Sequence, residues 1–256
     1  MPIDFHDAAN RLTYTRHRAG EDWARAVRAV AVPRGARVVD LGCGGGVYSG
    51  AWLDLGASEV VGVDFSAVMV DAAREHCGPR PGLTFRQGDA QATGLPDGRA
   101  DIVFARALVH HLGDPRACYQ EAYRLLAPGG RLLVQDRTPD DVRRPGSATH
   151  LRGWFFERFP ELLEVERARR PSSRAVTAAL RAAGFHAVSA RPLTEVRRTY
   201  ADREEVRADL LARTGRSLLH ELDDAQLAAL ADHVVARLPA GPVHESDHWT
   251  LWAGTR

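Results

Sequence analysis

A short apolar strand that runs into an acid and a glycine-rich turn constrains this chain more than any other segment. Residues 37–48 read R-V-V-D-L-G-C-G-G-G-V-Y. Glycine permits a positive φ in a tight turn and lets the backbone approach a ligand closely. The amides of such a turn lie at a helix N-terminus, where negative groups are favoured. We therefore predict a parallel strand, a helix after it, and a nucleotide-like cofactor at the carboxyl end of the strand.

The glycine spacing excludes two common nucleotide-binding loops. A G-x-G-x-x-G dinucleotide fingerprint that starts at Gly42 needs glycine at position 47, which is Val47. A phosphate loop needs a lysine, and the chain contains none. The pattern present is D-x-G-x-G-x-G, formed by Asp40, Gly42, Gly44 and Gly46. Taken alone, it is also compatible with a tight turn that binds no ligand.

A second acid supports the ligand interpretation. Residues 59–66 predict a buried strand that ends at Asp64, 22 residues after Gly42. At about this spacing, a carboxylate reaches a ribose diol in nucleotide-binding βαβ units. The alternative is that Asp64 only caps the following helix.

Further strands follow in order. We predict strands at 83–87 (before Gly-Asp-Ala at 88–90), 100–106 and 131–134, with a helix over 115–126 and a turn over 127–130. Beyond them we predict a helix over 172–183, a sixth strand over 185–191, a largely helical stretch over 202–238 and a short last strand over 249–252.

Together these motifs resemble those of the class I S-adenosylmethionine-dependent methyltransferases of the small-molecule type. The glycine turn looks like motif I, and LLAPGGRL at 125–132 is similar to the family's L-[KR]-P-G-G-x-L signature. The resemblance implies an α/β fold with a Rossmann-like seven-stranded sheet and an antiparallel last strand. It also implies S-adenosylmethionine as cofactor and no metal. The residues that it assigns to the cofactor are Tyr14, Asp40, Gly42, Gly44, Gly46, Asp64, Phe65, Met69, Asp89, Ala90 and Arg106.

We expect one domain over 1–256. A helical leader spans 1–32, the core spans 33–138, 172–198 and 243–256, and lid inserts span 139–171 and 199–242. The inserts would lie over the carboxyl edge of the sheet, where ligands bind in open α/β sheets. In the leader, Trp23 and Val27 have helical spacing. Tyr14 either contacts the cofactor or holds the leader against the core.

Composition limits the partners and the compartment. A formal net charge of +1 gives no general affinity for nucleic acid or anionic membranes. Three scattered cysteines fit neither a disulfide framework nor a zinc site, and they suit a reducing compartment. No apolar run reaches about 18 residues. We expect a cytoplasmic protein whose partner is a small-molecule acceptor.

The exit of the fourth strand holds the candidate catalytic residues. His111, with His110 as second choice, would act as general base or orient the acceptor, because imidazole titrates near neutrality. The alternative is a purely structural role for both rings. Arg106 would bind a carboxylate of cofactor or substrate, or else form a salt bridge with Asp101 or Asp136.

An aromatic cluster lies in the first insert. Trp154, Phe155, Phe156 and Phe159 either line an acceptor pocket or form the core of the insert itself. The pocket interpretation favours a partly planar or apolar acceptor.

The function expected from these features is methyl transfer from S-adenosylmethionine to O, N or C of a small molecule, such as a natural-product intermediate. Two alternatives stay open. One is a cofactor-binding enzyme that does not methylate, such as a cyclase or decarboxylase, and the other is a non-catalytic binding protein.

Overall fold

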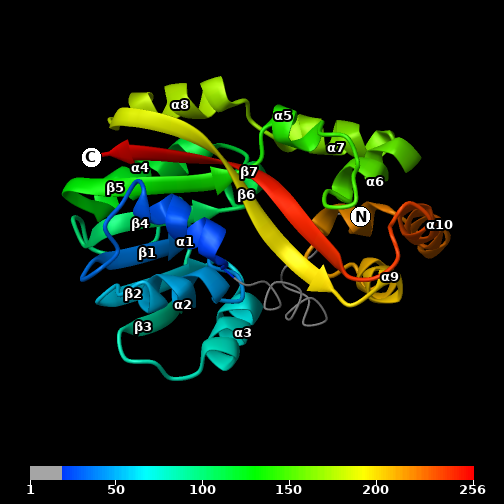
Figure 1. The fold of residues 1–256 in the computed structure, drawn as a ribbon. Coiled ribbons are helices and arrows are strands. Elements are labelled where there is room, and N and C mark those ends of the chain that lie inside the picture. Colours follow the sequence, from blue (N-terminus) through cyan, green and yellow to red (C-terminus); the bar gives the residue numbers. More distant parts are fainter. Residues whose placement is uncertain (1–18) are drawn as a thin grey trace.

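The computed structural model describes residues 19–256, so Tyr14 lies outside the described residues. A seven-stranded sheet with the order β3-β2-β1-β4-β5-β7-β6 forms its centre (Figure 1). β7 runs antiparallel to the two strands beside it, β5 and β6, and all other neighbouring strands are parallel. The strands are β1 (Arg37–Leu41), β2 (Glu59–Asp64), β3 (Leu83–Gln87), β4 (Ala100–Arg106), β5 (Leu126–Asp136), β6 (His186–Tyr200) and β7 (Val243–Thr255). The predicted Rossmann-like sheet is confirmed.

Helices lie on both faces of this sheet and beyond its carboxyl edge (Figure 1). The helices of the described chain are α1 (Glu21–Arg28), α2 (Val47–Asp54), α3 (Ala67–Cys77), α4 (Pro115–Leu125), α5 (Pro139–Val142), α6 (Arg152–Arg158), α7 (Glu161–Arg169), α8 (Ser173–Ala182), α9 (Arg203–Leu211) and α10 (Asp224–Val235), with 3₁₀ turns η2 (Val109–His111) and η3 (Ser217–Glu221).

Alternating residues of the central strands pack into two separate cores. Val38 packs with α1 and α2, whereas its neighbour Val39 packs with α4 and α8. On the first face, Trp23 meets the rings of Trp52 and Phe104 edge to face, at centroid distances of 5.1 and 5.9 Å. The period of two therefore places one layer of helices on each face.

The antiparallel pair of β6 and β7, whose strands are connected through α9, η3 and α10, forms a long hairpin. This hairpin is longer than the sequence predicts. It pairs continuously from His186 opposite Thr255 to Tyr200 opposite Val243, with two irregularities. Only the part of β7 from Thr250 to Thr255 pairs with β5. The predicted strands over 185–191 and 249–252 were thus too short, because the hairpin continues beyond the sheet and is covered there by the inserts.

The fifth strand differs as well. The turn predicted over 127–130 is a bulge inside β5, since Ala100 pairs with Leu126 and Ile102 with Arg131. The strand therefore extends from Leu126 to Asp136.

The two inserts form one lid, which consists of α5, α6 and α7 after β5 and of α9, η3 and α10 between β6 and β7 (Figure 1). Residues of both inserts share a single apolar core. The stretch 202–238 is helical as predicted, with interruptions around η3. The lid is therefore a packed unit and not two independent loops.

A buried charge network attaches the lid to the hairpin. Glu245 of β7 accepts from Arg216 at 2.6 Å and from Arg197 at 2.8 Å. Asp209 of α9 accepts from Arg216 at 2.6 Å. The hydroxyl of Tyr200 lies 2.8 Å from Glu245 and 2.9 Å from Asp209. Because the members are buried, each charge depends on its partners.

We expect Glu245→Ala to lower the free energy of unfolding by about 3–5 kcal/mol, because it removes one of the two buried carboxylates that Arg197 and Arg216 share. Chemical denaturation measures this change. Glu204→Ala, which removes an exposed acid of α9, is the control and should stay within about 0.5 kcal/mol of the parent protein. Equal stability of the two variants would contradict the role given to the network.

Candidate functional site

A cavity of about 490 Å³ lies at the carboxyl edge of the sheet, between the strand ends and the lid. It opens where the strand order reverses, between β1 and β4, which is the place where ligands bind in such sheets. The residues that line it are Asp40, Gly42, Cys43, Gly44, Gly45, Val47, Tyr48, Val63, Asp64, Phe65, Met69, Gly88, Asp89, Ala90, Gln91, Arg106, Ala107, Leu108, His110, His111, Leu112, Arg137, Arg152, Arg170, Gly215, Arg216, Ser217, Asp247 and Trp249.

The glycine turn and Asp64 lie together on the wall of the cavity. The backbone amide of Gly44 donates to Oδ2 of Asp64 at 2.8 Å. Oδ1 of Asp64 accepts from the amide of Ser66 at 3.0 Å. The cap of α3 is Ser66, whose hydroxyl accepts from the amide of Met69. The capping alternative for Asp64 is therefore wrong.

The glycines of the turn differ in what they do. A Cβ atom on Gly42 would lie 2.8 Å from the side chain of Leu108. Gly46 has a φ of +78°, precedes the first residue of α2, and would bring a Cβ atom within 2.8 Å of Phe85. Gly42 and Gly44 line the cavity, whereas Gly46 does not. Gly46 therefore shapes the turn but does not itself line the cavity.

Asp40 is buried below the turn. Its Oδ2 accepts from the hydroxyl of Ser49 at 2.5 Å. Burial raises the pKa of Asp40 to about 7, the hydrogen bond from Ser49 lowers it in part, and the charge of Asp64 raises it further.

The remaining residues assigned to the cofactor lie at neighbouring strand ends. Phe65 and Met69 follow β2, and Asp89 and Ala90 follow β3. Oδ1 of Asp89 accepts from the amide of Gln91 at 2.8 Å. All four residues line the cavity.

Arg106 lines the cavity, but its partner is neither of the two predicted acids. It contacts Glu195 of β6 at 3.3 Å and lies over the rings of Tyr48 and Trp249, at 4.2 and 4.4 Å. Asp101 instead pairs with Arg37 at 2.8 Å, and Asp136 pairs elsewhere. The prediction missed Glu195 because the extended β6 brings it across from a distant part of the chain.

His110 has an orienting carboxylate. Its Nδ1 lies 2.8 Å from Oδ2 of Asp136, at the end of β5. Burial raises the pKa of Asp136, but His110 and Arg170 outweigh it and hold that pKa well below its usual value. The ionised carboxylate accepts a hydrogen bond from Nδ1–H, so Nε2 of the neutral ring is free of a proton and can act as the acceptor.

Both imidazoles are neutral at neutral pH. Burial lowers the pKa of His110 to about 4, although Asp136 opposes this shift. Burial, and next the charge of His110, lower the pKa of His111 to about 3. The rings lie 3.9 Å apart, and both line the cavity.

The aromatic cluster of the first insert lies elsewhere. Trp154, Phe155, Phe156 and Phe159 are buried in the shared core of the lid and do not line the cavity. This arrangement favours the alternative that they form the core of the insert. They give no support for an apolar acceptor.

Sequence reasoning missed the charged residues on the side of the cavity that faces the lid. Arg137, Arg152, Arg170 and Arg216 line the cavity together with Asp247. All basic residues other than histidine in this chain are arginine, so no residue type distinguished these four. The position of Arg137 directly after a strand end was the one available sign.

The comparison with known proteins agrees with the site. A family model described as a methyltransferase domain matches residues 39–134, which contain the glycine turn, both strand-end acids and the two histidines. By this match, the chain contains a methyltransferase domain.

Similar proteins are named for different substrates. A phosphoethanolamine N-methyltransferase of Triticum aestivum is 28% identical over 232 residues, which cover 87% of this chain and 41% of that protein. A ubiquinone biosynthesis O-methyltransferase of Cereibacter sphaeroides is 34% identical over 125 residues, which cover 48% of this chain and 50% of that protein. The match thus spans half or less of each of these relatives.

Solved structures share the fold of this chain. A putative methyltransferase from an antibiotic biosynthesis pathway of Anabaena variabilis superposes with a TM-score of 0.68 at 18% identity, over 91% of this chain and 96% of that one. A Haemonchus contortus phosphoethanolamine N-methyltransferase 2 in complex with phosphomonomethylethanolamine and S-adenosylhomocysteine gives 0.61 at 18% identity, over 99% of this chain and 61% of that one.

Residues 19–256 lack two kinds of feature. They contain no helix long and apolar enough to cross a membrane. They also contain no group of three or more His, Cys, Asp or Glu side chains suited to hold a metal ion.

Asp40 makes the stability of this protein depend on pH. Because its pKa is raised from 3.8 to about 7 on folding, its stabilising contribution is complete below about pH 4 and is lost as the pH rises through about 7. We expect Asp40→Asn, without bound ligand, to melt about 2–8 °C above the parent protein at about pH 8, but not at about pH 4. Differential scanning calorimetry checks this. Asp54→Asn, at an exposed acid of α2, should leave the pH dependence unchanged, and the same result for Asp40→Asn would contradict the shift.

Proposed function

We propose that this protein transfers a methyl group from S-adenosylmethionine to O, N or C of a small-molecule acceptor, an intermediate of a natural-product pathway. The observation that carries the proposal is one cavity that holds both the glycine turn with its strand-end acids and an imidazole oriented by a carboxylate. The Anabaena neighbour is described as part of an antibiotic biosynthesis pathway, which supports the choice of pathway.

The residues present fit the cofactor. Gly42 and Gly44 leave the turn without side chains where the backbone meets the cavity, and Asp64 is held beside the turn by the Gly44 amide. In this proposal Asp64 accepts from the ribose hydroxyls, and Asp89 with Ala90 contacts the adenine. When bound there, the cofactor would supply a methyl group on a sulfonium.

His110 is the better candidate for the base. Methyl transfer requires a base only when the acceptor carries a proton at its nucleophilic atom. Asp136 fixes the ring of His110 and leaves Nε2 as the acceptor, which is the arrangement of an oriented general base. We therefore assign the base to His110, with His111 beside it, whereas the sequence favoured the reverse order.

Incubation of the purified protein with S-adenosylmethionine and a panel of phenols, amines and enols tests the proposal. We expect release of S-adenosylhomocysteine and a methylated product by mass spectrometry. Tight cofactor binding with no methylated product from any acceptor class would contradict it.

We expect Asp64→Ala to weaken S-adenosylmethionine binding by about 1.5–3 kcal/mol, the scale of a hydrogen bond to a charged group. Isothermal titration calorimetry measures the change. Asp71→Ala, at an exposed acid of the following helix, is the control and should bind like the parent protein. Unchanged affinity in Asp64→Ala would remove the ribose assignment.

We expect His110→Ala to lower kcat by about 10²–10⁴-fold at neutral pH, the usual contribution of a general base. Because burial lowers the pKa of His110 to about 4, the parent protein should lose activity only as the pH falls toward that value, and should be insensitive to this group between about pH 6 and 9. His111→Ala is the matched comparison in rate measurements across this range. A larger loss in His111→Ala would return the base to the residue that the sequence favoured.

A further inference from the structure

The lid side of the cavity is rich in buried guanidinium groups. Arg137 follows β5, Arg152 begins α6, Arg170 follows α7, and Arg216 precedes η3. Each is at most 7% exposed. Asp247 of β7 is the carboxylate that lines the cavity beside them.

Three of these four arginines have a close carboxylate. Arg137 lies 2.8 Å from Asp247. Arg170 lies 2.6 Å from Asp136, and Arg216 lies 2.6 Å from Glu245. Their charges are therefore compensated within the protein.

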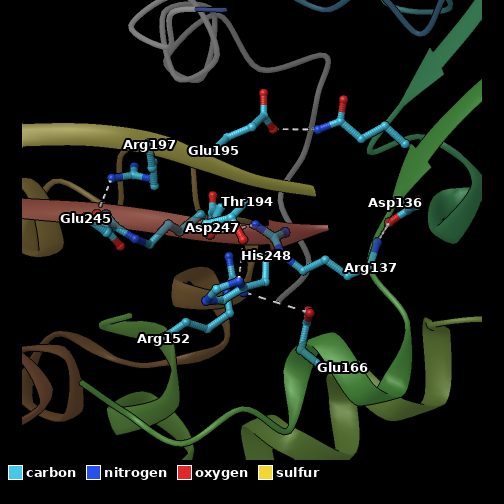
Figure 2. Close-up of polar contacts among 12 residues, drawn as sticks. Asp136, Arg137, Arg152, Glu166, Thr194, Glu195, Arg197, Glu245, Asp247 and His248 are labelled. Atoms are coloured by element: carbon cyan, nitrogen blue, oxygen red, sulfur yellow. Dashed lines mark hydrogen bonds and ion pairs between the residues drawn. The ribbon is translucent and has the colours of Figure 1, made fainter. Parts of the chain in front are cut away.

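Arg152 is the exception in the described chain. Its nearest carboxylate is Glu166 at 3.8 Å (Figure 2). The same Glu166 oxygen already accepts from Arg170 at 3.0 Å, and the other oxygen pairs with Arg169. Nε of Arg152 is buried without a hydrogen-bond partner.

The electrostatics of Arg152 agree with this geometry. Burial, and next the positive charge of Arg137, lower the pKa of Arg152 to about 9. The group remains a cation at neutral pH. A buried cation with so little compensation is costly unless an anion reaches it.

We propose that Arg152, with Arg137 beside it, binds an oxyanion of the acceptor, either a carboxylate or a phosphate group. The planar guanidinium fork suits such a group, because it donates two parallel hydrogen bonds. The inference rests on the proposed function, since it describes the acceptor of that reaction. It places the anionic group at the α6 side of the cavity that His110 also lines.

Titration of small probes into the complex with S-adenosylhomocysteine tests the inference without turnover. The probes are inorganic phosphate, propionate and the neutral isostere propionamide. We expect phosphate or propionate to bind and propionamide not to bind, and the stronger of the two anions identifies the group. Binding of neither anion, or equal binding of propionamide, would overturn the proposal.

Variants then assign the site. Arg152→Gln should weaken binding of the anionic probe at least about tenfold. Arg152→Lys keeps the charge without the fork, and should show a smaller loss even if the glutamine variant folds poorly. Arg158→Gln, at an exposed arginine of the same helix, is the control and should bind like the parent protein. Unchanged probe binding in both Arg152 variants would refute the assignment.

The affinity for S-adenosylhomocysteine separates two explanations. We expect it to be unchanged in Arg152→Lys and Arg152→Gln. A parallel loss would mean that Arg152 binds the carboxylate of the cofactor, which overturns an acceptor subsite. A failure of the proposed function, seen as no methylated product, would leave the probe titrations unaffected, so the two failures are distinguishable.

Discussion

Asp136 is a fully buried carboxylate that contacts both the candidate base and the lid. It ends β5, contacts Nδ1 of His110 at 2.8 Å, and pairs with Arg170 at 2.6 Å. Arg170 also forms an ion pair with Glu166, and Glu166 is the acid nearest to Arg152. A charge cannot remain buried without compensation. The position of the lid and the orientation of His110 are therefore two consequences of satisfying one carboxylate.

The two halves of the cavity are built in different ways. The half assigned to the cofactor consists of backbone amides and acids at the ends of parallel strands, where the pairing register brings Asp40 level with Gly62 and Asp64 level with Gln87. The lid half consists of long arginine side chains whose heads are held by carboxylates from other elements. Backbone groups have little freedom to move, whereas arginine heads adopt the geometry that their partners impose.

The lid is stabilised by a single apolar core and a charge network together. Phe155 of α6, Leu210 of α9 and Leu230 of α10 are fully buried in the same core. Arg216, beside them, is held by Asp209 and Glu245. Buried ion pairs of this kind add less to stability than apolar packing, but they are costly to break. They therefore fix the orientation of the lid relative to the β6–β7 hairpin.

The sequence by itself determined the central sheet and the cofactor half of the site. Asp40, Gly42, Gly44 and Asp64 were predicted to meet because they follow apolar strands, and strand ends of one parallel sheet converge on one edge. The family resemblance added Asp89, and all five residues line the cavity. Only the tertiary structure decided the lid half: that Glu195 and not Asp101 pairs with Arg106, that Asp136 orients His110, and that Arg152 lacks a close partner. These contacts join residues from 26 to 89 positions apart through side chains alone, and no local spacing records such pairs. The spacing of apolar residues along the chain indicates which segments form helices and strands. The partners of buried charges, in contrast, are determined only when distant elements pack together.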